Sequence, residues 1–400
     1  MTLKVAVCGA GIAGLAVAER MAALGAQVVV LERAPGPDPR GHLIDFYGAG
    51  YEAAEAIGAL PALKDASYRI DEATLVDEQG RRRGDLPYDQ IAKALDGRMC
   101  SLMRPDLEKT LRANLPEEVE LRFSATVTGV DSRADGVTVT LDGGETVEAD
   151  LLVGADGIRS VVRKLVFGTE TADPRYLGFH CAAFVVDASD IARESEIEQF
   201  AVTDTIDRHL DVFFLPDGRA AVFAMFGVPD AELPADPRAE IRDRFADMGW
   251  LVPEILHRCP PSEDIYYEAV AQVVMPRWSS DRVVLVGDAG AAVSPFAAHS
   301  ASLAVAGAYV LAEQFRTTSS VERALDFYEK LWRWVVEEKQ QISRDIGCWT
   351  LPGRSRPVSL RFTWRPLVKR FVTTTLGGEP NTVVAMLRRG TSNPASDVQT

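Results

Sequence analysis

The stretch LKVAVCGAGIAGLAVAERMAALGAQVVVLER, residues 3–33, decides the fold of this 400-residue chain. A short Val-rich apolar run, apolar residues at helical spacing and a second apolar run follow one another there, which predicts a βαβ unit. At its first turn, Gly9, Gly11 and Gly14 form a GxGxxG motif. The first glycine permits a tight turn, the second lets the backbone approach a pyrophosphate, and the third lets helix and strand pack closely.

The start of the predicted helix, with Ile12 and Ala13, offers free N–H groups and positive partial charge to phosphates. Glu32, at the end of the second apolar run, is placed to accept hydrogen bonds from ribose hydroxyls. We include the adjacent Arg33 in this predicted site. Because an acid at this position repels the 2′-phosphate of NADP, the pattern favours NAD or FAD.

The composition limits the possible functions. A hydrophobic content of 47% supports a large core, expected as two interleaved domains, and a net charge of −15 argues against nucleic-acid binding. No apolar run approaches the ~18 residues that span a bilayer. The last 50 residues are nevertheless basic, with eight Arg or Lys against two acids, and form either a solvated tail or a docking segment.

The five cysteines are widely spaced, without a CxxC pair or a metal-like Cys/His pattern. We therefore expect reduced thiols, no metal site and a cytoplasmic protein. We also expect a monomer or weak dimer.

Three later segments favour a bound dinucleotide in the same way. Arg104 opens the helical run RPDLEKTLRANL, where its guanidinium either holds cofactor phosphate and ribose oxygens or forms a surface salt bridge. The apolar run LLVGADG ends in Asp156 and Gly157, either as a cofactor contact that glycine makes possible or as a plain strand–turn–helix. A third apolar run, RVVLVGDAGAAVSP from Arg282, ends in Asp288.

In this order, the GxGxxG motif and the three segments resemble the hallmarks of the class A flavoprotein monooxygenases, the single-component FAD-dependent aromatic hydroxylases whose fold is typified by para-hydroxybenzoate hydroxylase. The resemblance covers residues 1–315. GHLIDFYGAGYEAAEAIG, residues 41–58, is most similar to the branch of tetracycline-inactivating and polyketide-tailoring monooxygenases. It implies FAD as the cofactor. Since no second complete GxGxxG is present, NAD(P)H is implied as a transient reductant.

The resemblance also assigns roles around the flavin ring. Gly287 and Asp288 would approach the ribityl chain, Pro295 would lie beside the ring, and Gly41 with Asp45 would approach the ring edge from the other side.

After Pro295, relatives carry a glycine-rich turn, but here the sequence has Ala298 and Ser300, followed by Ala301. A helix still follows, for which Ser300 or Ser302 is the expected N-cap. His299 is either a donor to flavin or substrate or a turn residue. The missing glycines leave three outcomes open, namely a normally placed flavin, a flavin swung outward, or FAD retained without redox turnover.

Between Leu177 and Gln272 the pattern changes to short strands joined at one point by an Asp217-Gly218 hairpin signal. This predicts an antiparallel sheet inserted into the nucleotide fold. Its side chains either pack against covering helices or face a substrate. As substrate-binding candidates we take His180, Arg208, Phe213, Phe223, Met225 and Pro295.

The resulting fold class is α/β, with a Rossmann-like FAD-binding domain of the GR2 type, an inserted antiparallel-sheet substrate domain and C-terminal helices. The expected boundaries are 1–75, 96–176 and 273–315 for the first, 76–95 and 177–272 for the second, and 316–400 for the last.

The predicted function is an FAD monooxygenase that uses NAD(P)H and O₂ to hydroxylate, epoxidise or insert oxygen into an aromatic or polyketide-like small molecule, in bacterial secondary metabolism or antibiotic modification. Pro295 and His299 are the candidate catalytic residues. A redox-neutral FAD-containing cyclase or rearrangement enzyme, and a catalytically idle FAD-binding regulator, are the alternatives.

Overall fold

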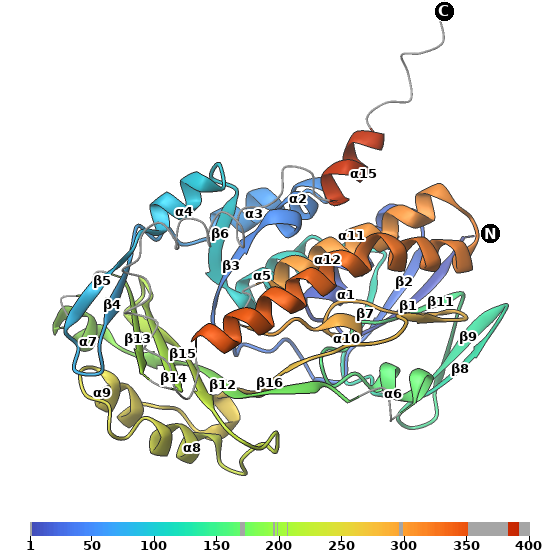
Figure 1. The fold of residues 1–400 in the computed structure, drawn as a ribbon. Helices are drawn as coiled ribbons and strands as arrows, with labels where there is room; N and C mark the ends of the chain where they lie inside the picture. Colours follow the sequence, from blue (N-terminus) through green and yellow to red (C-terminus); the bar gives the residue numbers. More distant parts are fainter. Residues whose placement is uncertain are drawn as a thin grey trace, which may run out of the picture.

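The fold is organised by the quoted βαβ unit. The computed structural model describes residues 2–168, 173–194, 197, 199–205, 207–295, 299–350 and 383–391. Within them β1 (Lys4–Cys8), α1 (Ile12–Ala23) and β2 (Gln27–Leu31) form the βαβ unit, with β1 and β2 parallel. The sheet around them has the order β17 (Ser279–Ser280), β18 (Val283–Leu285), β11 (Leu151–Gly154), β1, β2, β7 (Glu120–Arg122). All its pairs are parallel except β17 with β18, as expected of a Rossmann-like sheet (Figure 1).

A second, mainly antiparallel sheet lies beside the first (Figure 1). Its order is β16 (Tyr266–Gln272), β12 (Arg175–Asp187), β15 (Arg219–Gly227), β14 (Arg208–Phe214), β13 (Phe200–Thr205), β4 (Ala73–Val76), β5 (Arg82–Leu86). The expected inserted sheet is therefore present, and it confirms the predicted α/β class. Its first strand from the N-terminal half begins at Ala73, three residues before the expected boundary.

The two faces of this seven-stranded sheet have different neighbours. One face packs on α8 (Pro237–Arg244) and α9 (Val252–His257), through Phe184, Phe226, Phe245 and their neighbours. The opposite face lines the cavity described below. Since successive side chains of a strand point to opposite faces, sequence parity decides which residues reach the cavity.

Two long helices cover the Rossmann-like sheet. α11 (Ser300–Thr317) packs on α1 and on α12 (Val321–Thr350), and all three contribute to one core that contains Leu15, Val310 and Trp332. Figure 1 shows α11 and α12 side by side. Of the expected helical segment at 316–400, α12 and α15 (Val383–Thr391) are described, and most of the basic tail lies outside the described residues.

The remaining elements connect these layers. The small sheets are β10 (Thr146–Ala149), β9 (Gly136–Leu141), β8 (Val127–Arg133) and the pair β3 (Leu43–Tyr47), β6 (Met99–Met103). The other helices are α2 (Gly48–Ala56), α3 (Leu60–Asp65), α4 (Tyr88–Ala94), α5 (Arg104–Ala113), α6 (Val161–Phe167), α7 (Ser189–Glu194), the 3-10 turn Ser262–Asp264 and α10 (Asp288–Ala291).

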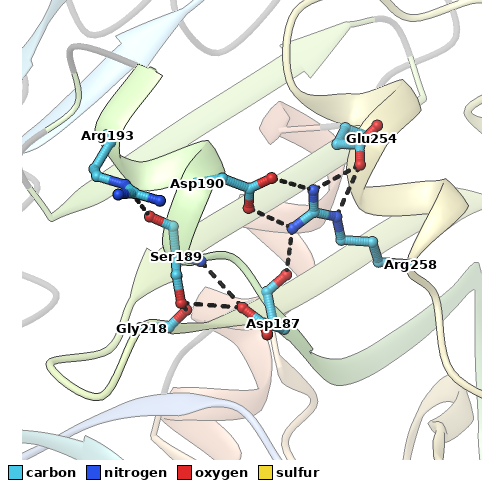
Figure 2. A network of polar contacts seen from close by, with 7 residues as sticks. All are labelled: Asp187, Ser189, Asp190, Arg193, Gly218, Glu254 and Arg258. Carbon is cyan, nitrogen blue, oxygen red and sulfur yellow. Dashed lines mark hydrogen bonds and ion pairs between the residues drawn. The ribbon is translucent and has the colours of Figure 1, made fainter.

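An exposed ion-pair network holds the outer rim of the seven-stranded sheet together (Figure 2). Arg258, just after α9, donates to both carboxylate oxygens of Asp190 in α7, at 2.6 and 2.7 Å, and to the carbonyl oxygen of Asp187 at 2.9 Å. It also pairs with Glu254. One guanidinium thus connects α7, α9 and the end of β12.

No described helix is both long enough and apolar enough to cross a bilayer. Among the described residues, no cluster of His, Cys, Asp and Glu has the makings of a metal site, and the four described cysteines are free and buried.

Candidate functional site

Two glycines of the GxGxxG motif, Gly9 and Gly14, lie where the backbone leaves no space for a side chain. Gly9 has φ +104°, and a Cβ there would lie 2.5 Å from the carbonyl oxygen of Ala155. A Cβ on Gly14 would lie 1.9 Å from the carbonyl oxygen of Gly9. The start of α1 is thereby pressed against the ends of β1 and β11. Gly11, Ile12 and Ala13, at the positive end of α1, line a cavity.

Glu32 follows β2 and turns back toward the same loop. Its two carboxylate oxygens accept hydrogen bonds from the N–H groups of Ala10 and Ala34, each at 2.8 Å. Each carboxylate oxygen retains a lone pair for a further donor such as a ribose hydroxyl. Arg33 is exposed and is not among the residues that line the cavity.

The cavity has a volume of about 380 Å³ and lies between the two sheets. One wall is formed by the nucleotide loop, a second by the segment after β18, and a third by the seven-stranded sheet. The residues that matter for its chemistry are Gly11, Ile12, Ala13, His42, Asp45, Tyr88, Arg104, Gly157, Phe200, Asp211, Phe213, Phe223, Tyr266, Glu268, Asp288, Pro295, Ser300 and Ala301.

Arg104 is the one Arg or Lys among the described residues that line this cavity. It opens α5 and pairs with Glu108 one turn later, at 2.8 Å. Gly41 packs closely on this helix start, because a Cβ there would lie 2.7 Å from Cδ of Pro105. Arg104 thus forms an ion pair and also faces the cavity, and its role toward cofactor oxygens stays a prediction.

The segment after β18 brings a second carboxyl group to the nucleotide loop. Gly287 has φ +61°, and a Cβ there would lie 2.8 Å from Cβ of Ala13. Asp288 therefore starts α10 beside the first turn of α1 and lines the cavity. Burial, together with the charge of Glu268, raises the pKa of Asp288 to about 6.

Pro295 lines the cavity on a strained backbone. The preceding residue, Ser294, is buried and has φ +90°, a conformation that costs about 1–3 kcal/mol for a residue other than glycine. Buried hydrogen bonds from α12 hold this segment. Gln340 Nε2 donates to the carbonyl oxygens of Val273 and Ala292, and the hydroxyl of Ser343 bonds that of Ser294.

Asp45 lies in β3 and faces the cavity between two hydroxyl donors. Ser101 Oγ donates to Oδ1 at 2.6 Å, and the hydroxyl of Tyr88 donates to Oδ2 at 3.2 Å. Burial raises the pKa of Asp45 to about 6, and the nearby charge of Asp211 contributes in the same direction.

The start of α11 differs from its prediction. Ser300 is the first helical residue and His299 the N-cap, with no side-chain cap bond, while Ser302 Oγ accepts from the N–H of Tyr47 at 3.2 Å. Neither serine is the expected N-cap. Ser300 and Ala301 line the cavity, and Ala298 lies outside the described residues.

His299 also departs from its predicted role. It is buried, its ring stands edge-on to Tyr47, and its ring nitrogens lie 3.2 Å from the Tyr47 hydroxyl. It is absent from the cavity wall, so the structure does not support its prediction as a direct donor to flavin or substrate.

Asp156 serves the fold rather than the cavity. Its carboxylate accepts hydrogen bonds from Ser160 Oγ and from the N–H groups of Val161 and Val162, so it satisfies the free N–H groups at the start of α6. Its neighbours Ala155 and Gly157, the latter with φ +75°, line the cavity instead.

The substrate candidates on the seven-stranded sheet divide by face. Phe213 and Phe223 line the cavity. Met225 lies on the same face of β15 as Phe223, but it packs behind the lining residues Cys181 and Val270 and is not part of the wall. His180 and Arg208 are corrected, because their side chains have other partners. His180 lies 2.9 Å from the Tyr267 hydroxyl and 3.0 Å from the carbonyl oxygen of Asp230, and Arg208 pairs with Asp247 and with the carbonyl oxygen of Arg244.

Several cavity residues were not predicted. His42 and Tyr88 lie in loop and helix starts without a motif of their own, and Phe200, Asp211, Tyr266 and Glu268 are single positions in strands. For Asp211 alone the sequence offered a clue, because Asp211 lies two residues before Phe213 in the same strand and therefore on the same face.

The whole arrangement matches a known family. The family described as "FAD binding domain" matches residues 2–339. The chain belongs to this FAD-binding family. An uncharacterized protein of Mycobacterium tuberculosis is 32% identical over 87% of this chain and 94% of its own length. A flavin-dependent monooxygenase of Legionella longbeachae is 28% identical over 87% of this chain and 88% of its own. The crystal structure of the tetracycline destructase Tet(51) has a TM-score of 0.81 at 25% identity and covers 95% of this chain and all of its own.

The resemblance to the flavoprotein monooxygenases is confirmed, and the protein is an FAD-dependent oxidoreductase of the monooxygenase class. The residues fit the cofactor. The crowded glycines leave bare backbone at the positive end of α1 for a pyrophosphate, Glu32 offers acceptors to a ribose, and Arg104 and Asp288 face one shared cavity.

Proposed function

We propose that this monooxygenase uses NAD(P)H and O₂ to hydroxylate a phenolic or polyketide-like small molecule. The observation that carries the proposal is the continuity of the cavity. Gly11 and Asp288 from the nucleotide elements and Phe213 and Phe223 from the seven-stranded sheet line the same space. A substrate ring packed on these phenylalanines and a flavin held by the nucleotide elements would share it. The tetracycline destructase with a similar fold supports a polycyclic phenol as the substrate class.

In this assignment the protein chain positions the substrate and the cofactor, and the cofactor supplies the reactive chemistry. Bound FAD supplies electron transfer and oxygen activation. The aromatic side chains of the sheet bind the apolar part of the substrate, and the walls exclude water. The start of α11, where Ser300 and Ala301 reach the cavity, contributes positive partial charge that favours an electron-rich ring oxygen. We assign the FAD-binding role to the Rossmann-like sheet and the substrate-binding role to the seven-stranded sheet.

The test is an anaerobic spectrum of the FAD-loaded protein. We expect NADPH to bleach the bound flavin slowly alone and faster when a polycyclic phenol is added, followed after aeration by a product one oxygen atom heavier. NADH and NADPH compared in the same experiment identify the reductant. Product formation without consumption of either nucleotide would overturn the proposal in favour of redox-neutral chemistry. A bound flavin that is bleached by neither NADH nor NADPH would overturn it in favour of a catalytically idle FAD-binding protein.

A further inference from the structure

His42 is a partly buried titratable residue on the cavity wall, and the proposed function assigns it no role. It precedes β3, and its carbonyl oxygen accepts a hydrogen bond from the N–H of Arg104 at 2.9 Å, which fixes its backbone. Its ring lies between two aromatic side chains of the seven-stranded sheet. The ring centroids are 5.0 Å from Phe223 and 6.1 Å from Tyr266.

The imidazole has no hydrogen-bond partner in the part of the chain that the structure describes. Its Nδ1 is fully buried and unpaired. His180 provides the contrast, since both of its ring nitrogens meet a protein oxygen within 3.0 Å. Because buried polar groups in native proteins are nearly always hydrogen-bonded, an unpaired imidazole facing a ligand cavity indicates that the partner belongs to the ligand.

The charge state of the imidazole limits what this partner can be. Burial and the positive charge of Arg104 lower the pKa of His42 to about 4, so the ring is neutral at pH 7. The wall that the seven-stranded sheet contributes also carries the titratable groups of Cys181, Asp211, Tyr266 and Glu268. The hydroxyl of Tyr266 donates to the Glu268 carboxylate at 2.5 Å. A neutral imidazole provides one donor and one acceptor, which suits a hydroxyl or carbonyl oxygen better than a charged group.

Building on the proposed function, we propose that His42 is a specificity-determining residue that hydrogen-bonds a phenolic or enolic oxygen of the substrate. The two rings that flank it come from β15 and β16 of the seven-stranded sheet, the sheet whose aromatic face meets the substrate in our assignment. The flavin also carries ring carbonyls, so the experiment separates the two possible sources of the partner.

Histidine labelling with diethyl pyrocarbonate, read by peptide mass spectrometry, tests the proposal directly. The chain has five histidines, which serve as internal standards. Exposed His257 should be labelled in every sample, and His180, with both nitrogens bonded, in none. We expect His42 to be labelled in the apoprotein and in the FAD-loaded protein, and to be protected when tetracycline or 1-naphthol is added to the latter. Protection by FAD alone, or labelling that neither probe changes, overturns the assignment.

Substitutions provide the second test. His42→Phe should weaken binding of the protective probe about tenfold, as expected for loss of a buried hydrogen bond, and leave the FAD dissociation constant within about twofold. His42→Gln, which keeps a donor and an acceptor, should recover part of the loss. His180→Phe is the matched control, which should lower stability and leave probe affinity unchanged. If the wild-type protein does not load FAD, the proposed function itself is contradicted. If the wild-type protein loads FAD and the His42→Phe variant binds the probe as well as wild type does, only the role of His42 is contradicted.

Discussion

At the residue scale, the carboxyl of Asp288 is held in a place that disfavours its charge. Its pKa rises from an ordinary 3.8 to about 6, so the folded protein binds the proton more tightly than the unfolded chain does. The stability that this group contributes is therefore fully present below about pH 4 and is lost as the pH rises through about 6. The same holds for Asp45, whose pKa is also about 6.

We expect Asp288→Asn to stabilise the FAD-free protein at pH 7.5 by about 1–2 kcal/mol, since the amide removes the cost of a buried charge. The gain should shrink toward pH 4.5. Urea unfolding at the two pH values measures it, with Asp135→Asn, at a carboxylate that is 92% exposed, as the control. A variant less stable than wild type at pH 7.5 would contradict this account. FAD affinity should fall in the same variant. Higher stability combined with weaker FAD binding would show that the Asp288 carboxylate serves the cofactor and not the fold.

The glycine of the α1 first turn gives the sharpest steric prediction. Gly14→Ala should destabilise the protein by about 3 kcal/mol or more and abolish FAD loading, because its Cβ would lie 1.9 Å from the carbonyl oxygen of Gly9. Flavin content after purification and thermal unfolding measure the two effects. Gly36→Ala, at a glycine with open space around it, should change neither. Normal flavin loading by the Gly14 variant would disprove the tight contact.

At the element scale, α12 functions as a support for the loop that carries Pro295. Its Gln340 fills two buried carbonyl acceptors, and Gln272 of β16 donates back to the carbonyl oxygens of Val293 and Gln340, each at 2.9 Å. The strained Ser294 lies within this segment. The loop therefore keeps its conformation through contacts with a helix more than 40 residues further along the chain.

Gln340→Ala should cost about 2–4 kcal/mol, because it leaves the buried carbonyl groups of Val273 and Ala292 unpaired. It should also weaken FAD binding, which flavin fluorescence quenching measures. Gln341→Ala on the same helix removes only exposed contacts with Asp345 and Arg344 and should change stability by less than about 0.5 kcal/mol. Equal effects of the two substitutions would rule out a specific role for Gln340.

The Arg258 network has a different character, because it is exposed (Figure 2). Arg258→Ala should lower the melting temperature only slightly at low salt and by still less at high salt, since exposed ion pairs are screened. FAD affinity should stay unchanged, since α7 and α9 lie on the face of the sheet away from the cavity. A large loss that persists in high salt would show that the carbonyl bond to Asp187 matters more than the charges.

The sequence predicts elements and their chemistry well, but not which face of a strand a side chain occupies. The glycine motif, Arg104, Asp288 and the strands around Phe213 and Phe223 follow from local pattern. His180 and Arg208 were wrong because both faces of the seven-stranded sheet are covered, one by helices and one by the cavity, so burial alone does not distinguish them. His42 was missed because its role depends on Phe223 and Tyr266, which lie about 180 and 220 residues away in the sequence.

At the scale of the whole molecule, the described residues form two large and separate hydrophobic cores. One core contains the Rossmann-like sheet with α11 and α12, and another contains the seven-stranded sheet with α8 and α9. The cavity lies between the sheets, so a molecule that fills it contacts both. Occupancy should therefore stabilise the chain as a unit.

We expect FAD to raise the free energy of unfolding by about 2.7 kcal/mol when its free concentration is 100 times its dissociation constant. The melting temperature should keep rising with FAD concentration. Riboflavin, which lacks the pyrophosphate and adenosine that the α1 turn would hold, should give a much smaller shift at equal concentration. An equal shift from riboflavin would contradict the assignment of the GxGxxG turn.

The order of the strands in the sequence also determines which sheet can be completed first during translation. The seven-stranded sheet is complete once the ribosome has released residue 272, the end of β16. The Rossmann-like sheet is still incomplete at that point, because β17 and β18 follow in the sequence, and Asp288 and Pro295 follow β18. The part assigned to the substrate is thus finished before the part assigned to the cofactor, although the cofactor motif is translated first. A chain whose residues up to 272 have left the ribosome has every strand of the substrate sheet, but Asp288 and Pro295 of the assigned cofactor site have not yet emerged.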